Sequence, residues 1–133
     1  MKTKNITFKN NYGLDILYFE HIKLLFDNEL KLIRFQLRIE FEFFRANTLL
    51  EVEEFDFMRL HECLYKMHNG QLKTFLFNPI GEQFIMKFEL QENGQIKVSV
   101  TINNSLFTGK LEFNYITDQS FIPDLLINSE ISF

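Results

Sequence analysis

The chain has 133 residues, a formal net charge of −4, 17 phenylalanines and no tryptophan. This length suits one domain, residues 1–133, built around a single hydrophobic core. The acidic balance and the lack of a basic stripe argue against nucleic acid as a partner, because no counterion release would favour binding. The single cysteine excludes an internal disulfide, and the three histidines show no metal-ligand spacing. We therefore expect no metal and no cofactor.

The sequence predicts neither an export signal nor a membrane segment. The basic start, Met1–Lys9, is not followed by an apolar stretch of the length that a signal peptide needs. Residues 30–44 are broken by polar side chains at every second position, whereas a membrane helix needs about 20 consecutive apolar residues. We expect a soluble protein in a reducing compartment, the cytoplasm.

The first expected elements are strands. Two short ones, Ile6–Lys9 and Leu14–Glu20, flank the turn signal Asn10–Gly13. Residues 33–43 then alternate strictly between apolar and polar side chains, with Phe43 among the apolar ones. A period of two over this length predicts a strand with one buried and one solvated face.

Residues 53–69 predict a helix. Apolar side chains recur there at helical spacing, at Phe57, Leu60, Leu64 and Met67. The first turn is acidic, and Asn69-Gly70 suits a C-terminal stop. Residues 71–78 are expected to form a strand that links this helix to the rest of the sheet.

Residues 82–115 predict an antiparallel meander, whose first turn contains Asn93-Gly94. A two-residue loop would mix apolar and polar faces. A three-residue loop, Glu92–Gly94 with Gly94 in the left-handed conformation, instead pairs Leu90 with Ile96 and keeps the apolar face continuous.

The opposite face of the meander carries charges that the same register would pair. Glu89 should lie across from Lys97, and a four-residue turn over residues 103–106 would place Lys97 across from Glu112 as well. Gly109 is expected inside the last strand, as a bulge or a close backbone approach.

A second helix is expected over about residues 119–127. Asp118 or Ser120 could cap it, and Ser120 is the simpler choice because Pro123 then falls in the first turn. Together the elements predict an α+β domain with one mainly antiparallel, curved sheet of about six or seven strands and two helices.

No catalytic motif is evident in the chain. His61 shares a helical face with Leu60 and Leu64, where a histidine is usually a core or boundary residue whose ring nitrogens are hydrogen-bonded. Cys63 is expected to be a small packing residue. An enzyme using His61 or His68 would need a carboxylate or thiol brought within hydrogen-bond reach by folding. We expect no catalysis.

One stretch of the chain is strongly acidic. Its acids are Glu40, Glu42, Glu51, Glu53, Glu54 and Asp56, and Arg45 is the basic residue among them. The simpler interpretation is a solvated strand edge followed by a helix N-terminus, which favours acids. The alternative is a docking surface for a basic partner, where complementary charge would speed encounter.

The order of elements resembles the WapI-type immunity proteins, small cytoplasmic antidotes to bacterial wall-associated contact-dependent toxins. The resemblance covers roughly residues 30–127. Its landmarks are the alternating strand before Ala46, the helix with Phe57, Leu60 and Leu64, the stretch Phe77–Phe84, the Asn-Gly hairpin, and Leu111–Tyr115 followed by Asp118–Ile122. It implies stoichiometric binding of a toxin domain, typically a nuclease, with occlusion of its active site or substrate groove. In that case Asp118 would be a structural cap, and the acidic residues would be the partner-binding surface on electrostatic grounds.

A second function is open, that of a carrier for a small apolar ligand or lipid. A Phe-rich curved sheet could enclose an apolar cavity. The carrier predicts a continuous void lined by Phe35, Phe41, Phe84, Phe88 and Phe113, whereas the inhibitor predicts a filled core and an acidic outer surface.

Overall fold

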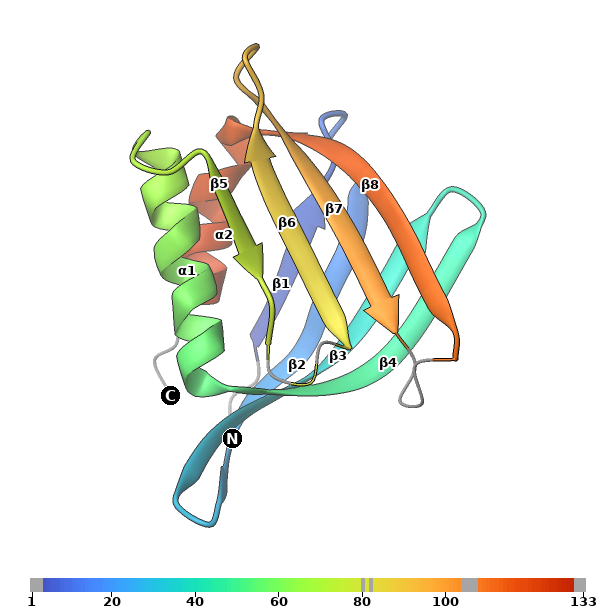
Figure 1. Cartoon of the computed structure of the whole chain (residues 1–133), viewed down its shortest axis with the longest axis vertical. Helices are drawn as coiled ribbons and strands as arrows, with labels where there is room; N and C mark the ends of the chain where they lie inside the picture. Colours follow the sequence, from blue (N-terminus) through green and yellow to red (C-terminus); the bar gives the residue numbers. More distant parts are fainter. Residues whose placement is uncertain (1–3, 80, 82, 104–107, 131–133) are drawn as a thin grey trace.

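The structure is a computed structural model that describes residues 4–79, 81, 83–103 and 108–130 (Figure 1). Within these residues the chain forms two antiparallel four-stranded sheets and two α-helices. The first half comprises β1 (Lys4–Lys9), β2 (Asp15–Asp27), β3 (Leu30–Phe41), β4 (Phe44–Glu53) and α1 (Glu54–His68). The second half comprises β5 (Thr74–Phe77), β6 (Phe84–Leu90), β7 (Gln95–Asn103), β8 (Lys110–Asp118), a 3-10 turn (Gln119–Phe121) and α2 (Ile122–Ser129). Each half is therefore a four-stranded meander followed by a helix.

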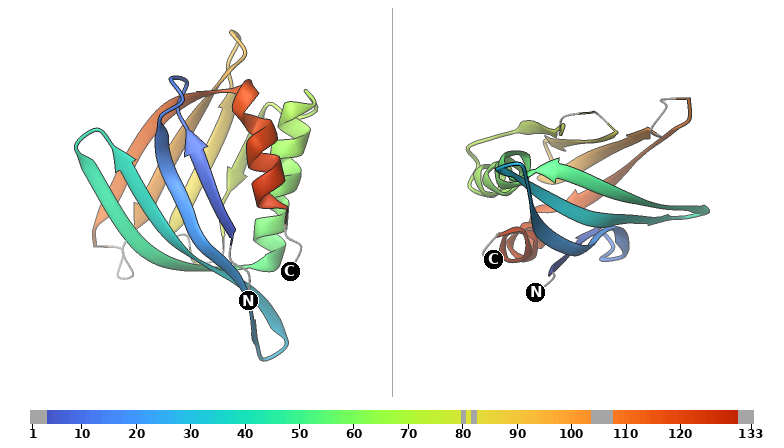
Figure 2. Two further views of the ribbon diagram at one scale, coloured as in Figure 1. Left: turned by 180° about the vertical axis from the view of Figure 1, so that it is seen from behind. Right: turned by 90° about the horizontal axis from the view of Figure 1, so that it is seen from below.

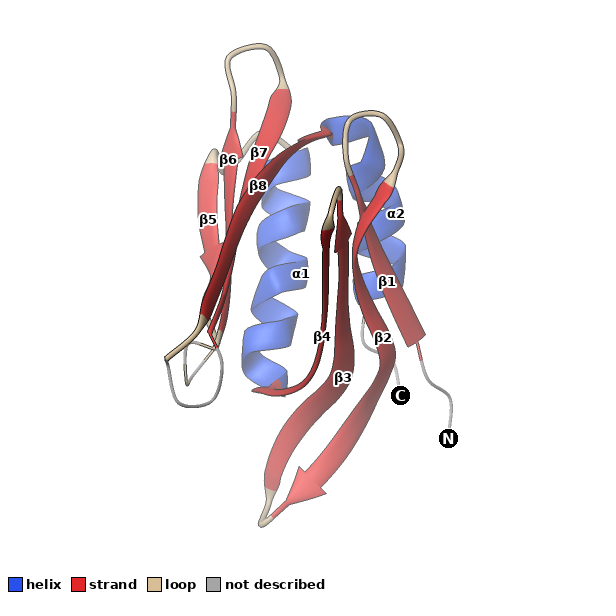
Figure 3. Ribbon diagram, turned by 90° about the vertical axis from the view of Figure 1, so that its right-hand side faces the viewer, coloured by secondary structure: helices blue, strands red, loops and turns tan. Residues whose placement is uncertain are grey.

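The two sheets lie face to face, and both helices run along one side of the molecule (Figures 1 and 2). Seen from the side, α1 lies between the planes of the two sheets and α2 lies beside β1 (Figure 3). One continuous core joins the inner faces of both sheets to the buried face of α1. Among the described residues no helix is long and apolar enough to cross a membrane.

The prediction of an α+β fold is confirmed, but the prediction of a single sheet with six or seven strands is wrong. The strand that the sequence did not reveal is β4, where Ala46, Thr48, Leu50 and Val52 point inward. A small and a polar residue at two of these four positions conceal the apolar alternation. The sheets are separate because α1 follows β4 directly and β4 does not pair with β5.

The first helix and its end agree with the prediction. The buried residues of α1 are Phe57, Leu60, Leu64 and Met67. Gly70 has a φ of +73°, as a residue that ends a helix in the left-handed conformation does.

The strand expected over residues 33–43 ends two residues early. Phe41 pairs with Phe44 across a two-residue turn in which Glu42 has a φ of +52°. Phe43, expected in the core, is therefore 96% exposed. A turn inside an apolar run is invisible to periodicity, because Phe43 continues the alternation by residue type alone.

The register of the meander is confirmed at its first turn and wrong at its second. Leu90 lies opposite Ile96, and Gly94 has a φ of +84°. Lys97 lies opposite Glu89 but across from Ile116 rather than Glu112. The difference from the expected β7–β8 register is four residues. An even shift keeps every side chain on its face, so the apolar pattern could not detect it.

The expected turn at residues 103–106 falls largely on residues 104–107, outside those described. Gly109 lies just before β8, which begins at Lys110, and not inside the strand as expected.

The second helix is shorter than expected and is preceded by a 3-10 turn. The Ser120 N–H donates to Asp118 Oδ1 at 2.9 Å, so Asp118 is the capping residue, not Ser120. Pro123 lies in the first turn of α2, where its missing N–H costs no hydrogen bond.

Candidate functional site

The six acidic residues singled out in the sequence do not form one surface. Glu51 and Glu53 lie at the end of β4, and Glu54 and Asp56 open α1. Glu40 and Glu42 lie at the other end of the β3–β4 hairpin, around its turn. We call Glu51, Glu53, Glu54 and Asp56 the acidic surface.

Two arginines form ion pairs with two of the six acidic residues. Arg34 donates through Nε and Nη2 to Glu51, its neighbour across the β3–β4 pair. Glu40 lies 2.6 Å from Arg38 Nη1. Glu53, Glu54 and Asp56 form no ion pair within the described part of the chain, so they carry the uncompensated charge of the acidic surface.

The outer face of the β1–β4 sheet is a compensated polar ladder around Arg38. Its guanidinium lies 3.7 Å from the ring centroid of Tyr18 and donates to both carboxylate oxygens of Glu20. These hydrogen bonds lower the pKa of Glu20 and raise that of Arg38. Arg38, Glu20 and Glu40 are therefore paired with one another on this face.

Apolar side chains border the acidic surface. Phe55, between Glu54 and Asp56 in the chain, is 71% exposed. On the outer face of the sheet, Leu32 lies opposite Glu53 and is only partly buried. An exposed aromatic ring therefore lies next to acids that have no ion-pair partner among the described residues.

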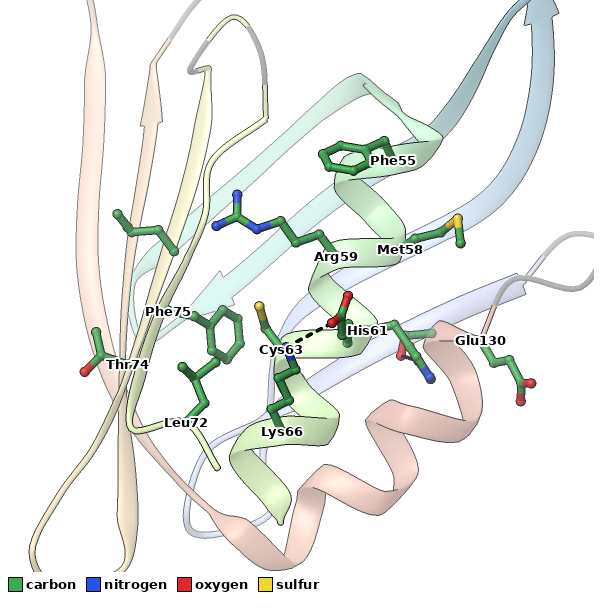
Figure 4. Close-up of a pocket in the computed structure, with 13 residues that line it drawn as sticks. Phe55, Met58, Arg59, His61, Cys63, Lys66, Leu72, Thr74, Phe75 and Glu130 are labelled. Carbon is green, nitrogen blue, oxygen red and sulfur yellow. Dashed lines mark hydrogen bonds and ion pairs between the residues drawn. The ribbon is translucent and has the colours of Figure 1, made fainter. Parts of the chain in front are cut away.

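A groove runs between α1 and the edge strand β5. It has a volume of about 850 Å³. The residues that line it come from α1, from the segment Leu72–Leu76 and from the end of α2; Figure 4 shows Arg59 and Cys63 on α1 pointing toward the side where Leu72 and Phe75 lie. The sequence gave no signal for this groove, because its two sides come from α1 and from a strand of the second sheet, whose contact only folding decides.

His61 and Cys63 are among the titratable side chains that line the groove. His61 Nδ1 lies 2.8 Å from Ser129 Oγ, and Ser129 is 1% exposed. This pair joins α1 to α2, as expected of a boundary histidine. Burial raises the pKa of the Cys63 thiol.

The phenylalanines expected to line a ligand cavity pack against one another instead. Phe35, Phe84 and Phe88 are almost completely buried. Phe41 stacks on Phe113 at a centroid distance of 4.9 Å. None of these five rings lines the α1–β5 groove or a second depression of about 430 Å³ near Leu37 and Leu111.

Comparison with known proteins adds little to this geometry. No group of three or more His, Cys, Asp or Glu side chains in the described ranges could hold a metal ion. No protein-family model matches the chain, and no curated protein matches it. A solved structure described as Trypanosoma brucei MRP1/MRP2 is similar at a TM-score of 0.46 and 8% identity, over 96% of this chain and 80% of that one. A likeness at this level supports no conclusion about function.

Proposed function

We propose that this protein is an immunity protein, which binds a cognate bacterial toxin domain in the cytoplasm and blocks it by occlusion. The observation that carries the proposal is the acidic surface with exposed Phe55 beside it. Aromatic rings that stay exposed in a folded monomer are typical anchors of protein interfaces. Nuclease domains, the usual toxins of the family that the sequence resembles, bind nucleic acid through basic surfaces, which an acidic surface complements.

The filled core supports this proposal over the carrier. A carrier needs an interior void. Here the ring centroids of Phe35 and Phe84 lie 4.4 Å and 5.8 Å from that of Phe19. Stoichiometric inhibition requires no turnover and therefore no cofactor. It requires a rigid surface, and the acidic surface lies at the junction of β4 with α1, two elements packed into the shared core.

The proposal predicts that a large secreted protein with a variable C-terminal domain is encoded directly upstream of this gene. The test uses that C-terminal domain, purified and mixed with this protein. Inhibition of the toxin domain should reach completion at a ratio of one to one. Reversing two acids, Glu53→Lys with Glu54→Lys, should slow association about tenfold at low salt, since steering by charge alters association rates by roughly 10–10³-fold. It should also flatten the salt dependence.

The matched control is Glu40→Lys with Glu42→Lys, an equal change in charge at the far end of the hairpin. This variant should associate at close to the native rate. Equal slowing by both pairs would mean that only net charge matters. If neither pair changes the association rate, or no inhibition occurs, the assignment of this surface is wrong.

A further inference from the structure

Within the described residues, strand β5 has a free edge. It pairs with β6 on one side and lies at the end of its sheet. The Leu90 N–H donates to Lys73 O at 2.8 Å, and Thr74 lies opposite Glu89 in the same ladder. Hydrogen-bonded and non-hydrogen-bonded pairs alternate in an antiparallel ladder. The backbone groups of Phe75 therefore bond to β6, and those of Thr74 and Leu76 point away from the sheet.

The free edge opens onto the α1–β5 groove. Thr74, Phe75 and Leu76 line the groove from the strand side, and Phe55 and Met58 line it from α1. Both sides expose apolar surface, since Phe55, Met58 and Leu76 are all large side chains open to solvent, and Leu76 is 44% exposed. Proteins usually cover or charge a strand edge, whereas this one faces an open groove whose lining includes apolar and charged side chains.

The charge in the groove is positive on the side of α1 that faces β5. Lys66 pairs with Glu62 at 3.0 Å, which leaves Arg59 without a carboxylate partner in the described ranges. Arg59 extends from α1 toward the β5 side of the groove (Figure 4). Glu130 lies at the α2 end, where its carbonyl oxygen accepts a hydrogen bond from Lys4 Nζ.

We propose that this groove binds an extended, acidic segment of a partner protein, which adds to β5 as a fifth strand of the β5–β8 sheet. The backbone of the segment would bond to Thr74 and Leu76, as in other cases of strand addition. An apolar side chain of the segment would contact Phe55, and a carboxylate would pair with Arg59. The site shares Phe55 with the border of the acidic surface, but its strand edge and Arg59 lie outside that surface, so it does not depend on the immunity function.

A second copy of this chain fits the groove less well than an acidic segment does. Two copies joined through β5 would form a two-fold interface, in which each residue meets its own surface patch. Such an interface would gather Arg59 and Lys73 from both chains, and neither residue forms an ion pair among the described residues. Like charges at an interface disfavour the pairing.

The test is a display library of ten-residue peptides with apolar residues at alternate positions and either Asp or Lys at one polar position, selected on the full chain. Peptides with Asp should be enriched. An enriched peptide, synthesised with a fluorescent label, should bind and slow amide hydrogen exchange at Thr74 and Leu76. Arg59→Glu should reverse the preference, so that the Lys peptide binds more tightly than the Asp peptide. The ratio of their Kd values should change by about tenfold, which corresponds to about 1.4 kcal/mol.

Two further arms make the result specific. Two peptides should be compared, one methylated on the backbone nitrogens of its odd positions and one on those of its even positions. One of them should lose binding and the other should keep it, because alternate amides face β5. The control Glu40→Lys with Glu42→Lys, at the far end of the β3–β4 hairpin, should leave peptide affinity unchanged. The proposal is wrong if no peptide is enriched, if both methylated peptides bind equally, or if protection appears at other residues. A shift to a dimer that Arg59→Glu strengthens would make a second copy the occupant and would also overturn it.

Discussion

Replacing Phe19 by alanine tests whether the two sheets and α1 share one core. Phe19 is 0% exposed. Its ring centroid lies 4.4 Å from that of Phe35, 4.9 Å from that of Phe8 and 5.8 Å from that of Phe84. It also contacts Phe57 of α1 at 6.5 Å. One side chain of β2 thus touches β1, β3, α1 and, in the other sheet, β6.

The expected loss in the free energy of unfolding is about 4–5 kcal/mol. Removal of a buried phenylalanine side chain costs about 3–5 kcal/mol, and the upper half of this range applies because several aromatic contacts vanish together. For a domain of this length the loss corresponds to a fall in Tm of about 15–20 °C. Phe19→Leu keeps most of the volume and should cost about 1–2 kcal/mol.

The assay is urea denaturation followed by far-ultraviolet circular dichroism and by tyrosine fluorescence, since the chain has no tryptophan. Both signals should give one coincident transition in the native protein and in Phe19→Leu. Phe43→Ala is the control, because Phe43 is 96% exposed and its loss should change stability by less than about 0.5 kcal/mol. Separate transitions for the two signals, or a loss below about 2 kcal/mol in Phe19→Ala, would refute a single shared core.

Two further predictions concern the β6–β7 turn and the polar ladder. Gly94→Val should lower the free energy of unfolding by about 1–2 kcal/mol and Gly94→Asn by less. The cause is the φ of +84°, since an added Cβ would meet Gln119 Nε2 at an ordinary contact distance of 3.5 Å. An unaltered urea midpoint in the valine variant would contradict the backbone strain. Hydrogen bonds from Arg38 lower the pKa of Glu20 below its ordinary value of 4.5, so the resulting stability is present above that pH and is lost as the pH falls through the lowered pKa. The stability gap between the native protein and Glu20→Gln should therefore shrink below about pH 4.5, and urea midpoints that keep the gap constant in acid would show that Glu20 contributes nothing.

Local patterns predicted local features well. The 3.6-residue period identified all four buried residues of α1, because a helix repeats its environment within a few residues. Turn chemistry placed the β6–β7 hairpin, since only one loop length kept its apolar residues on one face. The same reasoning failed at the β7–β8 turn. There Lys97 lies opposite Ile116, and the wrong register preserved the same faces.

The acidic residues illustrate the other limit. Their nearness in the chain predicted one surface, yet the turn at Glu42 sends β4 back along β3 and places Glu40 at the opposite end from Glu53. A separation of a dozen residues in extended strands is long enough to span the domain. Proximity in sequence is a guide to proximity in space only where the chain stays helical.

By itself the sequence determined the α+β class, the buried face of α1 and of β3, and the aromatic character of the core, because these follow from side-chain periodicity and apolar content. Only the tertiary structure decided that there are two sheets within the described residues, that β5 keeps a free edge, and that Arg59 lies beside it. The physical reason is that periodicity records which way a side chain points. Strand partners and groove walls depend on which apolar surfaces meet, and segments far apart in the chain share that choice.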